Sequence, residues 1–168
     1  MIKMALARVF TKLGAAVEVE QRIYGSNVDS SVSNPKKRPD ITIFHGDLRA
    51  AIDVTVVNPF TRSASSTARS VLDAPSFGTL KKAEASKTGY YRDACDAHGL
   101  IFIPFVVGVD GNLGVGARDF IHTLASVIYR PEYDKAHTYS EIVSTVQDAL
   151  ADGNNRMMVA HQRSLFSI

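Results

Sequence analysis

Two aspartates, Asp40 and Asp53, have the residue type and the setting to bind a metal ion. Asp53 stands in the middle of the apolar stretch AAIDVTVV, where a carboxylate is rare unless it is paired or binds a cation. Asp40 follows Arg38-Pro39 and opens an earlier β-forming stretch. Two close acids repel each other unless a divalent cation lies between them, and Mg²⁺ prefers such oxygen ligands. The structural alternative stays open: Asp40 caps a turn and Asp53 pairs with an arginine.

A β-hairpin would bring these two carboxylates together. The runs 40–44 and 51–57 are β-forming, and His45-Gly46-Asp47 between them has turn chemistry, which predicts antiparallel pairing. Side chains alternate between the two faces of a strand, so Asp53 and Thr55 share one face. Asp40 opens the partner strand. The hairpin therefore lets the two acids meet across it.

The rest of the chain alternates between helical and extended patterns. Apolar spacing predicts a helix over 2–13, a strand over 15–24 and a loop over 25–38. After the hairpin we predict a long loop over 60–79 and a helix over 80–98. An almost wholly apolar strand, buried on both faces, is predicted over 100–109. Further helices are predicted at 115–130, 140–151 and 155–166. The order α-β-β-β-α-β followed by C-terminal helices predicts an α/β (α+β) fold, a mixed β-sheet flanked by helices.

The composition is that of an ordinary globular chain. The 168 residues are 45% hydrophobic and 21% charged, so one domain over 1–168 is expected. The single cysteine, Cys95, excludes a disulfide framework and a cysteine-based zinc cluster. The longest apolar run, 100–109, is too short to span a bilayer, and the first residues lack a signal-peptide pattern. We expect a soluble intracellular protein with no membrane partner, nuclear if the source is eukaryotic and otherwise cytoplasmic.

Basic residues concentrate in one part of the chain, between residues 36 and 87, although the formal net charge is only +2. They stand with few acids among them and are Lys36, Lys37, Arg38, Arg62, Arg69, Lys81, Lys82 and Lys87. This charge balance permits a nucleic-acid partner without requiring one. Such runs also form ordinary solvated surfaces, so both interpretations stay open.

An ordered series of motifs contains Pro39-Asp40 and, after twelve residues, Asp53-x-Thr55 on an apolar strand. This series resembles the PD-(D/E)xK nuclease superfamily. The series is similar to the restriction-enzyme-like endonuclease domain of site-specific non-LTR retrotransposons, which itself resembles archaeal Holliday-junction resolvases. The other matching features, spread over residues 14–114, are Gly14-Ala15-x-Val17-x-x-Glu20, Val56-Val57-x-Pro59, Ala83-Glu84-Ala85-x-Lys87-x-x-x-Tyr91, Phe102-x-Pro104-Phe105-Val106-Val107, and Gly111 with Leu113-Gly114.

The resemblance implies a restriction-endonuclease-like core over residues 2–114 and a C-terminal helical part over 115–168. The superfamily's lysine normally stands two residues after the second acid, where this chain has Thr55. The resemblance implies that this lysine has moved to Lys87 on the following helix. Tyr91 lies four residues further and therefore on the same helix face, and the resemblance makes it and Glu20 site residues. Glu18 has the same strand parity as Glu20 and stays an alternative.

The implied activity is hydrolysis of DNA phosphodiester bonds with Mg²⁺ (or Mn²⁺) as cofactor. Asp40, Asp53 and the carbonyl of Val54 would hold the metal, and duplex or branched DNA would contact Lys36, Lys37, Arg38, Arg62, Arg69 and Lys82. Two alternatives remain: a catalytically inactive nucleic-acid-binding or assembly module, favoured by Thr55, and an RNA endonuclease of the cap-snatching type. A homodimer and membership of a larger polyprotein are both left open.

Overall fold

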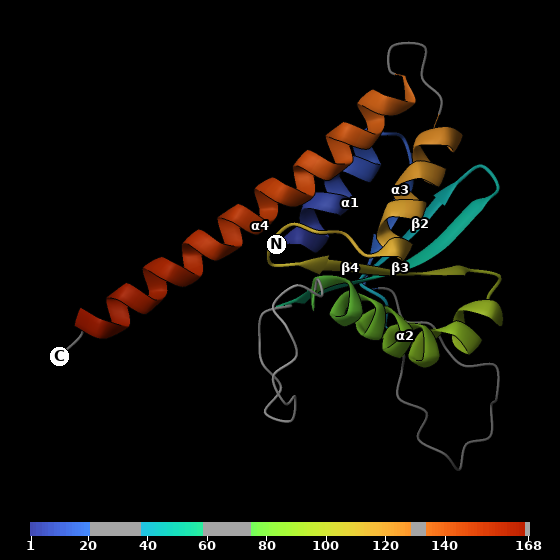
Figure 1. Ribbon diagram of the computed structural model, residues 1–168. Helices are drawn as coiled ribbons and strands as arrows, with labels where there is room; N and C mark the ends of the chain where they lie inside the picture. Colours follow the sequence, from blue (N-terminus) through green and yellow to red (C-terminus); the bar gives the residue numbers. More distant parts are fainter. Residues whose placement is uncertain (21–37, 59–74, 129–133, 167–168) are drawn as a thin grey trace.

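The computed structural model describes residues 1–20, 38–58, 75–128 and 134–166. The predicted order α-β-β-β-α-β followed by helices is confirmed (Figure 1). The elements are α1 (Ile2–Lys12), β1 (Ala16–Val19), β2 (Ile41–His45), β3 (Leu48–Val57), α2 (Pro75–Asp96), β4 (Ile101–Gly108), α3 (Val115–Val127) and α4 (Lys135–Phe166).

The four strands form one mixed sheet in the order β1-β2-β3-β4. Strand β2 pairs antiparallel with β1 and β3, whereas β4 runs parallel to β3 after the crossover through α2. The predicted hairpin is confirmed: His45 pairs with Leu48, and Gly46-Asp47 makes the turn. Gly46 has a φ of 56°, a conformation that glycine adopts without a steric penalty. This short turn fixes the β2–β3 register and with it the places of Asp40 and Asp53.

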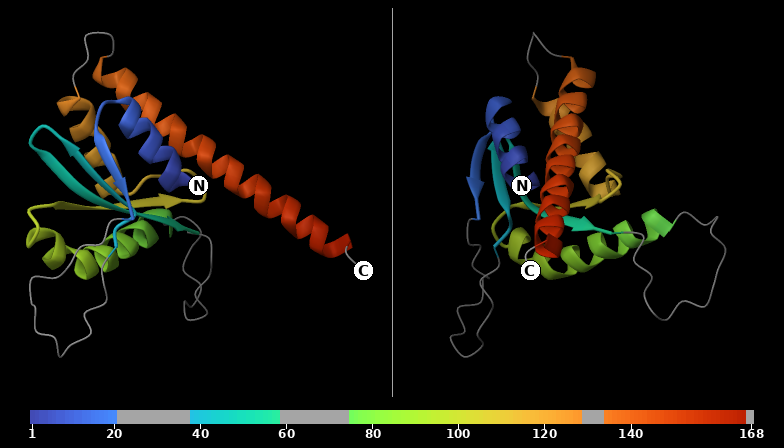
Figure 2. Two further views of the ribbon diagram at one scale, coloured as in Figure 1. Left: turned by 180° about the vertical axis from the view of Figure 1, so that it is seen from behind. Right: turned by 90° about the vertical axis from the view of Figure 1, so that its left-hand side faces the viewer.

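Helices cover both faces of the sheet (Figures 1 and 2). Helix α2 lies on one face, α1 and α3 lie on the other, and α4 packs against α1 and α3. Alternation along β3 divides its side chains between these layers. Ala50 and Ile52 belong to the larger core with α1, α3 and α4, while Ala51 belongs to a smaller core that includes Tyr91 and Cys95 of α2. The same alternation turns the side chain of residue 53 toward α2.

The C-terminal residues form one helix, so the prediction of two helices at 140–151 and 155–166 is wrong. Helix α4 runs continuously from Lys135 to Phe166, and its residues Ile142, Val146 and Leu150 are buried in the larger core. Gly153 inside a helix costs only about 1 kcal/mol relative to alanine, which does not end a helix held by tertiary packing. In the described part of the chain no helix has the combination of length and apolarity that crossing a membrane requires.

Other predicted boundaries also need correction. Helix α2 begins at Pro75, inside the predicted loop 60–79, and in the described part of the predicted strand 15–24 the strand β1 covers Ala16–Val19. Residues 21–37 and 59–74, which include most of the predicted loops 25–38 and 60–79, lie outside the described residues. The prediction that strand 100–109 is buried on both faces is wrong, because β4 stands at the edge of the sheet: Ile101 is 57% exposed, and burial begins at Phe105.

A carboxylate on α2 fixes the start of α3. Oε1 of Glu84 accepts a hydrogen bond of 2.8 Å from the backbone N–H of Gly116 in the first helical turn, where the positive end of the helix dipole favours an anion. A Cβ on Gly114 would lie 2.3 Å from the same oxygen, so a side chain at this position would displace the Glu84 carboxylate. The contact ties α2 to α3 across the edge strand β4, and it gives Glu84 a structural role.

Candidate functional site

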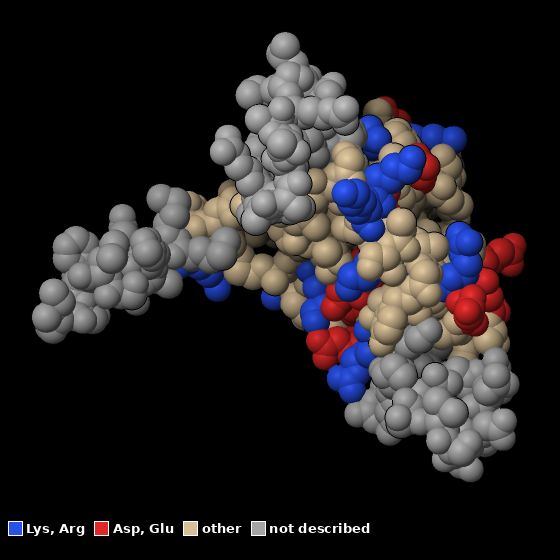
Figure 3. Space-filling view, turned by 60° about the horizontal axis from the view of Figure 1, so that its bottom comes forward, with Lys and Arg blue, Asp and Glu red and all other residues tan. Residues whose placement is uncertain are grey.

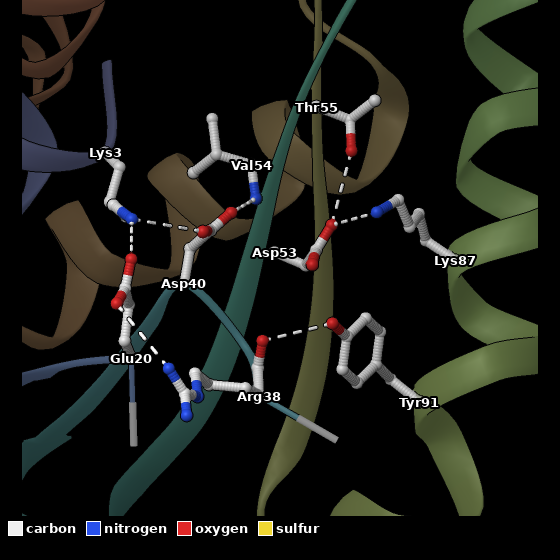
Figure 4. Close-up of polar contacts among 9 residues, drawn as sticks. All are labelled: Lys3, Glu20, Arg38, Asp40, Asp53, Val54, Thr55, Lys87 and Tyr91. Atoms are coloured by element: carbon white, nitrogen blue, oxygen red, sulfur yellow. Dashed lines mark hydrogen bonds and ion pairs between the residues drawn. The ribbon is translucent and has the colours of Figure 1, made fainter. Parts of the chain in front are cut away.

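Asp53 is a buried carboxylate on β3 that faces α2. Its Oδ2 lies 2.8 Å from Nζ of Lys87, and the side chain is only 7% exposed. The same oxygen accepts a hydrogen bond of 3.2 Å from the hydroxyl of Thr55 (Figure 4). The shared face predicted for Asp53 and Thr55 is confirmed, and Lys87 does face the sheet. Because a buried carboxylate is costly unless it is paired, the ion pair with Lys87, whose side chain is about one-third exposed, offsets the cost of burying Asp53.

Asp40 lies immediately before β2, and continuing the β2–β3 register by one residue brings it level with Asp53. Its Oδ2 accepts a hydrogen bond of 2.8 Å from the backbone N–H of Val54, and its Oδ1 lies 3.6 Å from Nζ of Lys3. In Figure 4 the two carboxylates lie beside the same stretch of β3, with Asp40 turned toward Lys3 and Asp53 toward Lys87. The structure thus brings the two acids together around Val54, with a separate lysine for each.

Tyr91 packs beside this pair of acids and holds the segment that precedes Asp40. Its ring stacks on Phe102 with centroids 5.0 Å apart, and its hydroxyl donates a hydrogen bond of 3.1 Å to the backbone carbonyl of Arg38. Burial, and then the nearby charge of Asp53, raise the pKa of Tyr91 well above its ordinary value. The phenol therefore keeps its proton and acts as a hydrogen-bond donor to the chain leading into Asp40.

Replacing Tyr91 by phenylalanine should remove this hydrogen bond and keep the stacked ring. We expect the free energy of unfolding to fall by about 1 kcal/mol, measured by urea denaturation, because the carbonyl of Arg38 loses its protein partner. The stacking on Phe102 is retained, so the secondary structure should be unchanged by circular dichroism. An unfolding free energy equal to that of the wild type would contradict this anchoring role.

A second group of charges surrounds Asp40 on the side of α1. Lys3 of α1 binds both Asp40 and Glu20, and Nη1 of Arg38 lies 3.9 Å from Oε2 of Glu20. The backbone N–H of Glu20 also donates to the carbonyl of Asp40 at 3.0 Å, and Glu20 has a φ of 57°, an uncommon conformation for a residue with a side chain. Glu20 is exposed and takes part through Lys3, while Glu18 lies opposite Thr42 in the β1–β2 pairing.

The electrostatics of this group follow from the contact between Lys3 and Glu20. The hydrogen bond from Lys3, together with the lysine charge, lowers the pKa of Glu20. The same hydrogen bond raises the pKa of Lys3 against the opposing effect of burial, with help from the charge of Asp40. Both groups therefore stay charged through the neutral range, and this pairing is lost only as the pH falls through the lowered pKa of Glu20 or rises through the raised pKa of Lys3.

Lys3 is the site residue that sequence reasoning missed. It stands in the first turn of an amphipathic helix, where a charged residue between apolar ones is ordinary. Its contacts depend on the strand that returns at Asp40, far along the chain, so no local spacing singles it out.

The predicted DNA-contacting residues fall into two groups. Arg38 is exposed beside the acids, and Lys82 is exposed on α2. Lys36, Lys37, Arg62 and Arg69 lie outside the described residues. Figure 3 looks onto the α2 side of the molecule, where Lys and Arg side chains alternate with Asp and Glu over the described surface. That face therefore carries mixed charge and is not uniformly basic.

The donor set around Val54 fits a hard cation in part. One carboxylate, Asp53, lies on β3, and the other, Asp40, lies just before the neighbouring strand β2. Such carboxylates suit Mg²⁺, because this ion keeps several waters and takes one or two carboxylates from a protein. Among the described residues no group of three His, Cys, Asp or Glu side chains lies close enough to form a fuller metal cage. A cation here would therefore rest on Asp40, Asp53 and backbone oxygen, with Lys3 and Lys87 balancing the two negative charges.

Comparisons with known proteins leave the site to be interpreted from its own geometry, because no protein-family model and no curated protein sequence matches this chain.

Proposed function

We propose that the protein is a metal-dependent DNA endonuclease built on a restriction-endonuclease-like core of the PD-(D/E)xK type. The observation that carries this proposal is the 2.8 Å contact between Lys87 and Asp53. It supplies a cation beside the two acids, where the strand itself offers only Thr55. Phosphodiester hydrolysis needs positive charge at the phosphate in the transition state, and a lysine on α2 meets that need as well as one on β3.

Each residue has a role that follows from its position. Asp40, Asp53 and the Val54 carbonyl would hold Mg²⁺ (or Mn²⁺), which when bound lowers the pKa of a water and stabilises developing negative charge. Lys87 offsets the charge of the phosphate. Tyr91 keeps the segment before Asp40 in place. Glu20 acts indirectly, because it orients the amine of Lys3 that contacts Asp40.

A second candidate function is a nucleic-acid-binding or assembly module with the same core and no catalysis. Two observations favour it. Thr55 fills the superfamily's lysine position, and both acids already have lysine partners, so Lys3 and Lys87 could serve as permanent counter-ions. An RNA endonuclease would use the same residues, and the substrate test below separates it from a DNA endonuclease.

The test is a cleavage assay on labelled duplex DNA, branched DNA and RNA of matched length. Each substrate is incubated with Mg²⁺, Mn²⁺, Ca²⁺ or EDTA. We expect internal cuts in DNA with Mg²⁺ or Mn²⁺, binding without turnover in Ca²⁺, and no cutting in EDTA, because Ca²⁺ has looser coordination geometry. Cleavage that survives EDTA would overturn the metal mechanism. Binding without cleavage under every condition would favour the inactive module, and cutting of RNA alone would favour the RNA enzyme.

DNA binding should depend on salt through the exposed basic residues. We expect Lys82→Ala to flatten the slope of log K against log salt concentration by about 0.9 if Lys82 contacts one phosphate. Lys135→Ala is the matched control, because Lys135 is also exposed but lies at the start of α4. Titrations by fluorescence anisotropy in Ca²⁺ measure both slopes. An unchanged slope for Lys82→Ala would place that charge away from the bound DNA.

A further inference from the structure

An apolar groove opens next to Asp40, on the side of the sheet away from α2. It has a volume of about 440 Å³ and lies between the start of α1, strand β3 and helix α4. Its lining includes Val54, Val56 and Leu150. Lys3 and Asp40, which belong to the candidate functional site, also line the groove. Lys3 and Asp40 therefore connect the groove directly to the proposed position of the scissile phosphate.

We propose that this groove binds one unpaired nucleotide adjoining the phosphate that is cut. The inference rests on the proposed nuclease function and adds a substrate class to it: DNA with an unpaired nucleotide at the cleavage position. The ligand chemistry is that of a nucleobase with its sugar. Apolar side chains cover the faces of the base, and the nearby ammonium of Lys3 accommodates the phosphate.

The position of the groove selects this occupant. A phosphodiester always has a nucleoside on each side, so a phosphate held at Asp40 has a nucleoside within reach of the groove that Asp40 lines. On the α2 side, Lys87 already contacts Asp53, and Tyr91 is buried in the smaller core. On the other side the groove leaves space, and Val56 is 47% exposed within its lining. Covering that apolar surface with a base removes it from water, which favours binding.

The size and chemistry of the groove also fit a single nucleotide. Small-molecule sites have volumes of roughly 300–1,000 Å³ and are mostly apolar with a few polar groups. This groove has that volume and, beside its aliphatic lining, three polar side chains, those of Lys3, Asp40 and Asn154. A base stacked inside a duplex cannot enter a concave groove. It must first unstack, and this costs least when the base is mismatched or already single-stranded.

Gly153 offers a way to fill the groove without removing any contact. A Cβ added at Gly153 would lie 3.6 Å from Cε of Met1, an ordinary packing distance. Gly153→Ala therefore fits and leaves most of the groove open, whereas Gly153→Leu extends an isobutyl group into it. Both residues favour helix over glycine, so α4 should be retained in each variant. Gly153→Ala is thus the matched control for Gly153→Leu.

The experiment measures binding, so it does not depend on turnover. Anisotropy titrations in Ca²⁺ compare a duplex with the same duplex carrying one unpaired 2-aminopurine nucleotide. We expect the wild type and Gly153→Ala to bind the second DNA about tenfold more tightly, with a change in 2-aminopurine emission. Gly153→Leu should lose both effects and keep its affinity for the plain duplex. Val56→Thr, which preserves the β-branched shape, should weaken the preference in the same direction if Gly153→Leu fails to fold.

Three results would overturn the groove assignment. The first is that the wild type binds the two DNAs with equal affinity. The second is that Gly153→Leu and Gly153→Ala prefer the DNA with the unpaired nucleotide to the same extent. The third is that light scattering shows a wild-type dimer that Gly153→Leu converts to a monomer. The last would assign the groove to a second copy of the chain. Failure of the nuclease proposal would give a different result from failure of the groove assignment. DNA would never be cut, yet the wild type would still prefer the unpaired nucleotide and Gly153→Leu would still lose that preference.

Discussion

Asp53→Asn should reduce DNA cleavage by ~10²-fold or more while the chain remains folded. The substitution keeps the shape of the side chain and removes the charge that the proposed metal and Lys87 both require. Its structural cost should be small, because Lys87 is about one-third exposed and its ammonium can turn to water when the partner is lost. DNA affinity should hold or rise, since one negative charge near the phosphates disappears.

Asp96→Asn is the matched control for this prediction, because Asp96 is an exposed aspartate near the end of α2. Single-turnover cleavage rates at saturating Mg²⁺ and anisotropy in Ca²⁺ separate chemistry from binding. Thermal unfolding shows whether the variant is folded. If Asp53→Asn cuts DNA at a rate close to that of Asp96→Asn, Asp53 has no place in the chemistry and the metal site proposed around Val54 is wrong.

The part of the site that sequence could predict depends on local periodicity. Alternation along AAIDVTVV put Asp53 and Thr55 on one face, and the turn residues between 44 and 48 set the hairpin that brings Asp40 level with Asp53. Helical spacing placed Lys87 and Tyr91 on one face of α2. These relations involve neighbours within a turn or a hairpin, so the structure reproduces them.

What sequence could not predict depends on contacts between distant elements. The role of Lys3 requires α1 to lie beside the start of β2, and the role of Glu84 requires α2 to lie beside the start of α3. Tyr91 was expected as a site residue, but the partner of its hydroxyl, the backbone carbonyl of Arg38, lies on a distant segment of the chain. The continuity of α4 through Gly153 is likewise a tertiary effect, since the packing of Leu150 and its neighbours outweighs the local helix penalty.

Lys87→Ala should slow cleavage by ~10²-fold or more, because a cation at a phosphate whose charge is developing stabilises the transition state by several kcal/mol in a partly dehydrated site. Lys81 and Lys82 are exposed on the same helix, so Lys81→Ala and Lys82→Ala are the matched controls and should alter binding more than rate. Single-turnover rates measure the difference. A normal rate for Lys87→Ala with a slow rate for Lys82→Ala would mean that Lys82 holds the catalytic position.

The double variant Thr55→Lys with Lys87→Ala tests whether a lysine on β3 can replace Lys87 in supporting DNA cleavage. Thr55 shares its strand face with Asp53, and its hydroxyl lies 3.2 Å from Oδ2 of that acid. A lysine at residue 55 therefore starts beside the carboxylate that Lys87 now contacts at 2.8 Å. We expect the double variant to recover at least about tenfold of the rate lost in Lys87→Ala. If it recovers nothing although it folds and binds DNA, the amine must approach from α2, and the position of Lys87 contributes more than its charge.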